Sequence, residues 1–172
     1  IFTIPISVFT LFYGYDIIGI YGAEYIEAGG VFKILIWTVC FLFINGACSM
    51  VLNASHKEYS VTKIYTAAAI FNICLNMVLI PNFNVYGASV ATVLSEILIL
   101  ILELYMISKI NQLPDRHLVY DVIKICIASG VLGIVLYALN LNMWIAMPVS
   151  IVVYFAVIFL VRTVDQDDKL II

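Results

Sequence analysis

One carboxylate in this sequence stands where a charge is hardest to accommodate. Glu96 lies ten residues inside the apolar run 86–107, about 15 Å deep at ~1.5 Å per residue and close to the middle of a ~30 Å hydrocarbon core. An ionised carboxylate there costs at least ~2.5 kcal/mol. We therefore expect Glu96 to face protein or water, or to be protonated. Two roles suit its chemistry: binding a coupling cation or a proton, and anchoring a structural hydrogen bond.

Amide and hydroxyl side chains recur at helical spacing in the same run and in two neighbouring ones. Residues four apart lie on one face of a helix, and the polar residues placed this way alongside Glu96 are Asn45, Ser49, Asn72, Asn76 and Thr92. Two interpretations stay open. The polar side chains form hydrogen bonds between helices, worth roughly 0.6 kcal/mol each, or they line a polar cavity between helices.

Other features of run 86–107 concern packing rather than chemistry. Gly87, Ala91 and Ser95 form a stripe of small residues, which predicts close approach of another helix. Glu103 lies near the end of the run, and we expect it to extend to the membrane surface or to pair with Lys109.

The remaining reactive residue types form no catalytic or metal-binding pattern. His56 and His117 lie in polar loops, and the cysteines, which are predicted to be small buried hydrophobic residues, have no C-x-x-C spacing. They are Cys40, Cys48, Cys74 and Cys126. No glycine-rich phosphate loop or nucleophile elbow is visible. We predict no catalytic residues, no metal and no cofactor, and hence a protein that is not an enzyme.

The composition indicates what must surround these residues. The chain is 65% hydrophobic and 11% charged, with a mean hydropathy of +1.13, whereas a soluble domain has about 25% charged residues. This is an integral membrane protein. Its net charge of −3 argues against a nucleic-acid partner, which would require a basic face.

Apolar runs divide the chain into helices long enough to cross a bilayer, which takes about 20 residues. The predicted full spans are residues 31–52, 60–80, 86–107, 120–139 and 143–161, and residues 1–13 are predicted to be the end of another helix. The break at 140–142 is short, so residues 120–161 are predicted to form a hairpin. The fold class is therefore an all-α, multi-pass helical bundle, which we expect to be a piece of a longer protein.

Basic residues predict the orientation, because Lys and Arg concentrate on the cytoplasmic side. They fall mostly at alternate breaks and at the end of the chain, namely Lys57, Lys63, Lys109, Arg116, Lys124, Arg162 and Lys169; only Lys33 lies on the opposite side. The loops 53–59 and 108–119 and the tail 162–172 are thus expected in the cytoplasm. Residues 14–29 and the turn at 81–85 are expected on the outer side of the cell membrane.

Three stretches taken in order resemble a known family. They are GAEY at 22–25, VLNASHKEY at 51–59 and NICLNMVLIPNFNVYGASVATVLSE at 72–96. Their order and spacing resemble the C-terminal half of oligosaccharide flippases in the multidrug/oligosaccharidyl-lipid/polysaccharide exporter superfamily. Ser89 departs from the family's more usual alanine at that place, which puts nothing about the fold in doubt.

The resemblance implies a multidrug-and-toxin-extrusion-like fold of about fourteen helices in two lobes plus a terminal pair, a plan based on parallel repeats. Residues 1–107 would belong to the second lobe and 120–161 to the terminal pair, and the first lobe would be a partner from the same chain. The implied cargo is a lipid-linked oligosaccharide, a polyprenyl phosphate or pyrophosphate sugar, moved to the outer leaflet for polysaccharide or glycan biosynthesis.

Alternative functions stay open. A multidrug or lipid II exporter of the same superfamily would use the same architecture, and a buried acid suits a cationic drug. A membrane acyltransferase would need a histidine or serine with a partner in the membrane. A non-transporting scaffold of a glycan-assembly complex would not need an ionisable group at the midplane.

Overall fold

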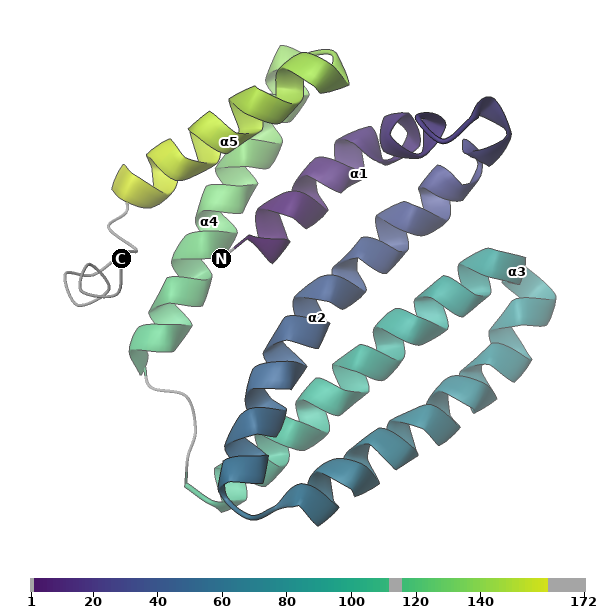
Figure 1. Cartoon of the computed structure of the whole chain (residues 1–172), viewed down its shortest axis with the longest axis vertical. Helices are drawn as coiled ribbons and strands as arrows, with labels where there is room; N and C mark the ends of the chain where they lie inside the picture. The colour runs from purple at the N-terminus through teal and green to yellow at the C-terminus, as the bar shows by residue number, and fades with distance from the viewer. Residues whose placement is uncertain (1, 112–115, 161–172) are drawn as a thin grey trace. The chain divides into compact units, whose positions relative to one another are not determined.

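The structure, a computed structural model, describes residues 2–111 and 116–160, and this part of the chain is all-helical without strands. The elements in Figure 1 are α1 (Thr3–Gly19), the 3₁₀ turn η1 (Ala23–Tyr25), α2 (Ala28–Ala54), α3 (Glu58–Lys109), α4 (Arg116–Leu139) and α5 (Met143–Leu160). They form two compact units, one containing α2 and α3 and the other containing α1, η1, α4 and α5. The predicted all-α fold class is confirmed.

Helix α3 consists of two arms joined by a tight turn. Its 52 residues would extend ~78 Å as a straight helix, more than twice the hydrocarbon thickness, but Figure 1 shows the helix folded back on itself. The backbone leaves helical geometry at Asn84, where φ is 50° and ψ is −132°. Pro81 just before it cannot donate a helical hydrogen bond, and asparagine accepts a positive φ more readily than most residues. The predicted break at 81–85 is thus confirmed; residues 58–83 are the first arm below and residues 85–109 the second.

The two arms approach most closely near Gly87. A Cβ atom added there would lie 2.4 Å from the carbonyl oxygen of Leu79, a distance that no side chain tolerates. Ala91 and Ser95 continue the same stripe down the second arm, and all three residues are buried. The small residues therefore permit the close helix approach that the sequence predicted.

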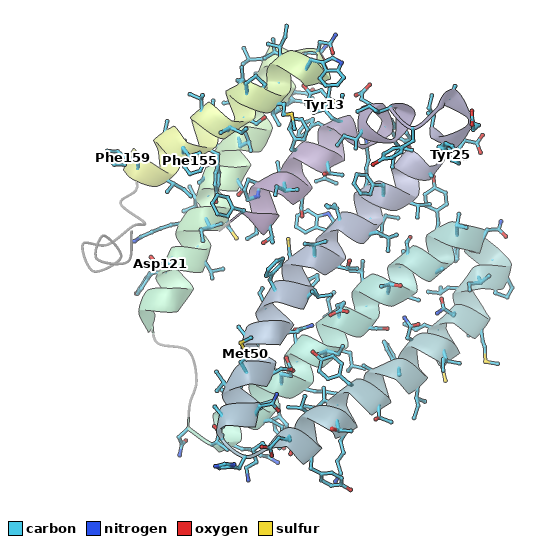
Figure 2. The ribbon with its side chains drawn as sticks, in the orientation of Figure 1. Tyr13, Tyr25, Met50, Asp121, Phe155 and Phe159 are labelled. Carbon is cyan, nitrogen blue, oxygen red and sulfur yellow. The ribbon has the colours of Figure 1, made fainter. Side chains whose placement is uncertain are left out.

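In the other unit, α1 packs against the hairpin of α4 and α5. The core between these helices includes Tyr13, Ala128, Leu132 and Tyr154, and the Tyr13 hydroxyl, labelled in Figure 2, donates a hydrogen bond of 2.8 Å to the carbonyl oxygen of Leu141. The hairpin turns at residues 140–142, as predicted. The sequence-based division placed residues 1–13 with the spans up to residue 107, whereas the contacts of α1 are with α4 and α5; the division into lobe and hairpin stays a prediction.

The predicted helix boundaries were wrong at both ends of the first loop and at the start of α4. Helix α1 continues to Gly19 instead of ending at residue 13, because Gly14 and Asp16 interrupt an apolar pattern that resumes at once; a glycine inside a helix costs only about 1 kcal/mol. The break before α2 therefore covers residues 20–27 rather than 14–29. Helix α4 begins at Arg116, inside the predicted loop 108–119. Residues 112–115 of that loop and the tail 162–172 lie outside the described residues.

The outer faces of the helices match the bilayer expected from composition. Three helices of the described chain are long and apolar enough to cross a membrane, and α1 and α5 are shorter apolar helices. Large apolar side chains project from the ribbon, as Met50 on α2 and Phe159 on α5 show in Figure 2. Since the hydrocarbon of a bilayer solvates such side chains, their exposure needs no protein partner.

Candidate functional site

A hydrogen bond between α2 and the second arm of α3 joins two of the polar residues predicted from the sequence as site candidates. The Asn45 amide nitrogen lies 2.8 Å from Glu96 Oε2 and 3.1 Å from the Glu96 backbone oxygen, and it donates to both. Asn45 is only 1% exposed, whereas Glu96 is half-buried. The carboxylate thus has one amide donor on its protein side and remains accessible on the other.

A second polar chain joins the two arms of α3. Asn76 donates 2.8 Å to the amide oxygen of Asn72, and Asn72 donates 2.9 Å to the Ser95 hydroxyl. The Ser95 hydroxyl in turn donates a hydrogen bond of 2.7 Å to the carbonyl oxygen of Ala91. The donors therefore point in one direction along the chain, and Ser95, which the sequence indicated only as a small packing residue, is the member that connects the arms.

Thr92 is placed differently from its predicted companions. Its hydroxyl donates 3.0 Å to the carbonyl oxygen of Ala88, four residues earlier in the same helix. A threonine that satisfies its own helix in this way has no proton left for another partner. Among the six predicted site residues, Thr92 and Asn76 are thus the two whose own described hydrogen bond stays within one helix, and Asn76 is linked to the other arm only through Asn72.

Ser49 belongs to a cluster that the sequence reasoning missed. Its hydroxyl donates to Oε1 of Glu103, and its oxygen lies 3.4 Å from the hydroxyl of Tyr65 on the first arm. The single hydroxyl proton of Ser49 already lies in the hydrogen bond to Glu103, so the Tyr65 hydroxyl is the donor in the second contact. The cluster therefore links α2 with both arms of α3.

The prediction that Glu103 reaches the membrane surface or pairs with Lys109 was wrong. Glu103 is fully buried, and the ammonium of Lys109 lies 4.4 Å from the centre of the Tyr105 ring. Spacing gave a partial signal: Glu103 follows Glu96 by seven residues, two helical turns, so both acids lie on one face of the helix, and in the structure that face meets α2. Ser49 follows Asn45 by four residues, one turn, and the two pairs run along the same contact.

Three buried atoms of this unit have no hydrogen-bond partner among the described residues. They are Asn45 Oδ1, Asn76 Oδ1 and Glu103 Oε2. All three are oxygens in carboxyl or amide groups, which accept hydrogen bonds, bind water and coordinate hard cations. The α2–α3 unit therefore fastens its helices through polar contacts and also retains free acceptor capacity in its interior.

The other reactive residue types add no second site in the part of the chain that the structure describes. Cys40 and Cys48 are buried as predicted, but Cys74 and Cys126 are exposed; the prediction erred because an apolar run does not show which helix face meets protein. No group of three potential metal ligands occurs among the described residues. A cavity of about 790 Å³ lies beside the α4–α5 turn, lined by residues such as Asp16 and Asn142, and contains none of the predicted site residues.

Comparison with known proteins finds similarity to membrane proteins, flippases among them. No protein-family model matches the chain. It is 27% identical over 158 residues to the probable flippase AglR of Haloferax volcanii, a match covering 90% of this chain and 33% of AglR. It is also 28% identical over 109 residues to an uncharacterised membrane protein of Methanocaldococcus jannaschii, and this match covers 63% of the chain and 22% of that protein.

The fold has a counterpart of known structure. The lipid II flippase MurJ, in an inward closed conformation, matches with a TM-score of 0.80 and 19% sequence identity, over 91% of this chain and 35% of the MurJ chain. This likeness establishes the fold. The chain spans about a third or less of the length of the relatives it matches.

Proposed function

We propose that this chain, a member of the multidrug/oligosaccharidyl-lipid/polysaccharide exporter superfamily, is part of a flippase for lipid-linked oligosaccharide. The flippase would move a polyprenyl phosphate or pyrophosphate sugar from the cytoplasmic to the outer leaflet of the cell membrane. The relation to a probable flippase along 90% of the chain is the observation that carries the proposal. The product would feed polysaccharide or glycan biosynthesis.

The polar groups of the α2–α3 unit support this function. A sugar head group has to cross ~30 Å of hydrocarbon, so the pathway needs hydrogen-bonding side chains at membrane depth. Asn72, Asn76 and Asn45 supply such side chains, and two of them carry a buried oxygen that has no partner within the described ranges. In the complete transporter, Asn45, Ser49, Asn72, Asn76, Thr92 and Glu96 would line or support the second-lobe side of a central cavity.

Glu96 would have a different role from the amides. A phosphate or pyrophosphate is anionic, so a carboxylate repels it and is not its ligand. Glu96 keeps one face accessible while Asn45 holds the other, an arrangement suited to binding a coupling cation or proton in exchange for cargo. The C-terminus would lie in the cytoplasm, following the basic residues of loops 53–59 and 108–119.

A second candidate, export of lipid II, is favoured by the fold of MurJ. The same two-lobe plan and the same polar interior would serve either lipid-linked cargo, since both carry a lipid tail and a polar, anionic head. Multidrug export and a scaffold role remain alternatives without a specific observation in their favour.

The proposal is tested in cells whose own oligosaccharide flippase gene is deleted. The complete transporter is expressed, and lipid-linked oligosaccharide on the cytoplasmic leaflet is measured against glycan at the cell surface. We expect the trapped pool to fall and surface glycan to return. Correctly inserted protein that leaves the pool trapped would overturn the proposal, and lipid II export and drug accumulation assays then separate the alternatives. A scaffold would restore glycan even with Glu96 replaced by glutamine.

A further inference from the structure

Glu103 occupies the most enclosed acidic environment of the described chain. Its side chain is 0% exposed, and the apolar core of the same unit includes Leu52, Ile64 and Ile107. This burial is supplied entirely by α2 and α3. Further protein or lipid around the unit cannot expose Glu103.

The two carboxyl oxygens of Glu103 differ in their hydrogen-bond partners. Oε1 accepts a hydrogen bond from the Ser49 hydroxyl, while Oε2 is buried without a partner among the described residues. A carboxylate distributes its charge over both oxygens and requires donors at each. One hydroxyl donor is too little to balance an ionised group that has been removed from water.

The charged and titratable groups facing Glu103 do not compensate a negative charge. From α2 come Ser49 and the thiol of Cys48, which lies within electrostatic range. From the first arm comes the Tyr65 hydroxyl, through Ser49. On the second arm itself, Glu96 is another acid and supplies no counter-charge, and the ammonium of Lys109 is placed over Tyr105. No ion pair involves Glu103 in residues 2–111 and 116–160.

We propose that Glu103 is a proton-binding site, occupied when α2 packs against the second arm of α3 and vacated when that contact opens. In the packed state the neutral acid avoids the penalty of a buried charge. When the helices part, water reaches Oε2, the O–H bond breaks, the proton passes to water, and the carboxylate that remains is hydrated while keeping Ser49 as a donor. The inference rests on the proposed flippase function for its purpose, which is to couple proton movement to opening of the transporter.

Glu96 does not duplicate this site. Its side chain is only half-buried, and its carboxylate already accepts a hydrogen bond from the Asn45 amide, so it is not enclosed in the way that Glu103 is. The two acids lie about 10 Å apart along the second arm. Coupling through Glu103 would therefore act at the α2–α3 contact rather than in the pathway of the cargo.

The first test is spectroscopic and needs no cargo. Infrared difference spectra between low and high pH are recorded on the complete protein in membranes. We expect the absorption of a protonated carboxylic acid that is present in wild type and in the exposed control E58Q, and absent from E103Q. S49A should move that absorption to higher frequency, because the C=O group loses its donor. If E103Q does not fold, the comparison of wild type with S49A decides; an absorption that S49A leaves unmoved, or that E103Q retains, overturns the inference.

The second test measures transport in vesicles with and without a pH gradient. Coupling between sites typically changes an equilibrium by ~5–150-fold, so we expect E103Q to reduce gradient-stimulated transport at least fivefold, while E58Q keeps the wild-type response. An E103Q protein with the wild-type gradient response makes Glu103 structural and overturns the inference. Wild-type protein that moves no cargo but shows the Glu103 absorption overturns the proposed function and leaves the proton site standing.

Discussion

The Asn45 amide of α2 donates to the Glu96 carboxylate of α3 over 2.8 Å, and to the Glu96 backbone oxygen over 3.1 Å. Two residues 51 positions apart in sequence are thus held together within apolar helices, where a lone acid is costly. The contact explains how Glu96 is tolerated in an apolar helix while one face stays accessible. It also makes Asn45 the residue on which the geometry of Glu96 depends.

Replacing Asn45 by alanine should weaken the α2–α3 unit. The substitution removes the only described side-chain donor to Glu96, and a buried group left without its partner costs ~1–3 kcal/mol. The matched control is Asn53→Ala, an exposed asparagine on the same helix, where a change within about 0.5 kcal/mol is expected. Unfolding of the purified protein by heat or by a denaturing detergent measures both; equal stability of the two variants would contradict the structural role of Asn45.

Glu96→Gln should lower transport without preventing membrane insertion. Glutamine keeps an oxygen that accepts from Asn45 but cannot take up and release a charge, so we expect at least a tenfold loss, equivalent to about 1.4 kcal/mol on the barrier. Transport assays normalised to inserted protein measure the loss, with the exposed Glu58→Gln as control. Wild-type transport in the Glu96 variant would remove that carboxylate from the mechanism.

Gly87→Ala should disrupt the turn between the arms of α3. The added methyl group would lie 2.4 Å from the Leu79 oxygen and 2.6 Å from its carbon, so the backbone must shift; overpacking of this kind costs ~1–3 kcal/mol or more. Gly46→Ala on α2 is the control, because a methyl group added at that position meets nothing within 4 Å and alanine favours a helix by up to ~1 kcal/mol. We expect the two variants to shift thermal stability in opposite directions.

The Asn72–Ser95 hydrogen bond can be measured by a double-mutant cycle. The single variants Asn72→Ala and Ser95→Ala each break the 2.9 Å contact, and the double variant removes both partners. Bonds between membrane helices average ~0.6 kcal/mol, with a maximum near ~1.7, so we expect a coupling energy in that range. Additive effects, with no coupling, would indicate that the two arms are held together by packing of their small residues alone.

The helices and their order could be predicted from the sequence because hydropathy and turn chemistry are local. The run lengths, the break at 81–85 and the hairpin turn at 140–142 all follow from residues close to them in the chain. The end of α1 could not be predicted, since Gly14 and Asp16 indicate a loop locally but are accommodated by a helix that packs against α4. The pairing of Asn45 with Glu96 depends on contact between helices that are far apart in the sequence, and no local pattern predicts such a contact.

Glu103 shows the same limit at the candidate site. Its position near the end of an apolar run and six residues before Lys109 favours a side chain reaching for the surface. Burial is decided by which face of the helix meets α2, and only the combined register of Glu96 with Asn45 and of Glu103 with Ser49 fixes that face. Both spacings can be read from the sequence, but the contact between α2 and the second arm of α3 cannot.

The most direct test of flippase activity uses the complete transporter, purified and placed in vesicles with a labelled lipid-linked oligosaccharide on one leaflet. The label on the starting leaflet is accessible to an impermeant reagent, and its protection over time measures movement of the head group across the bilayer. We expect protection to appear with wild-type protein and to be at least tenfold slower with Glu96→Gln, a difference of about 1.4 kcal/mol. Protection no faster than in protein-free vesicles would contradict a flippase for this class of lipid.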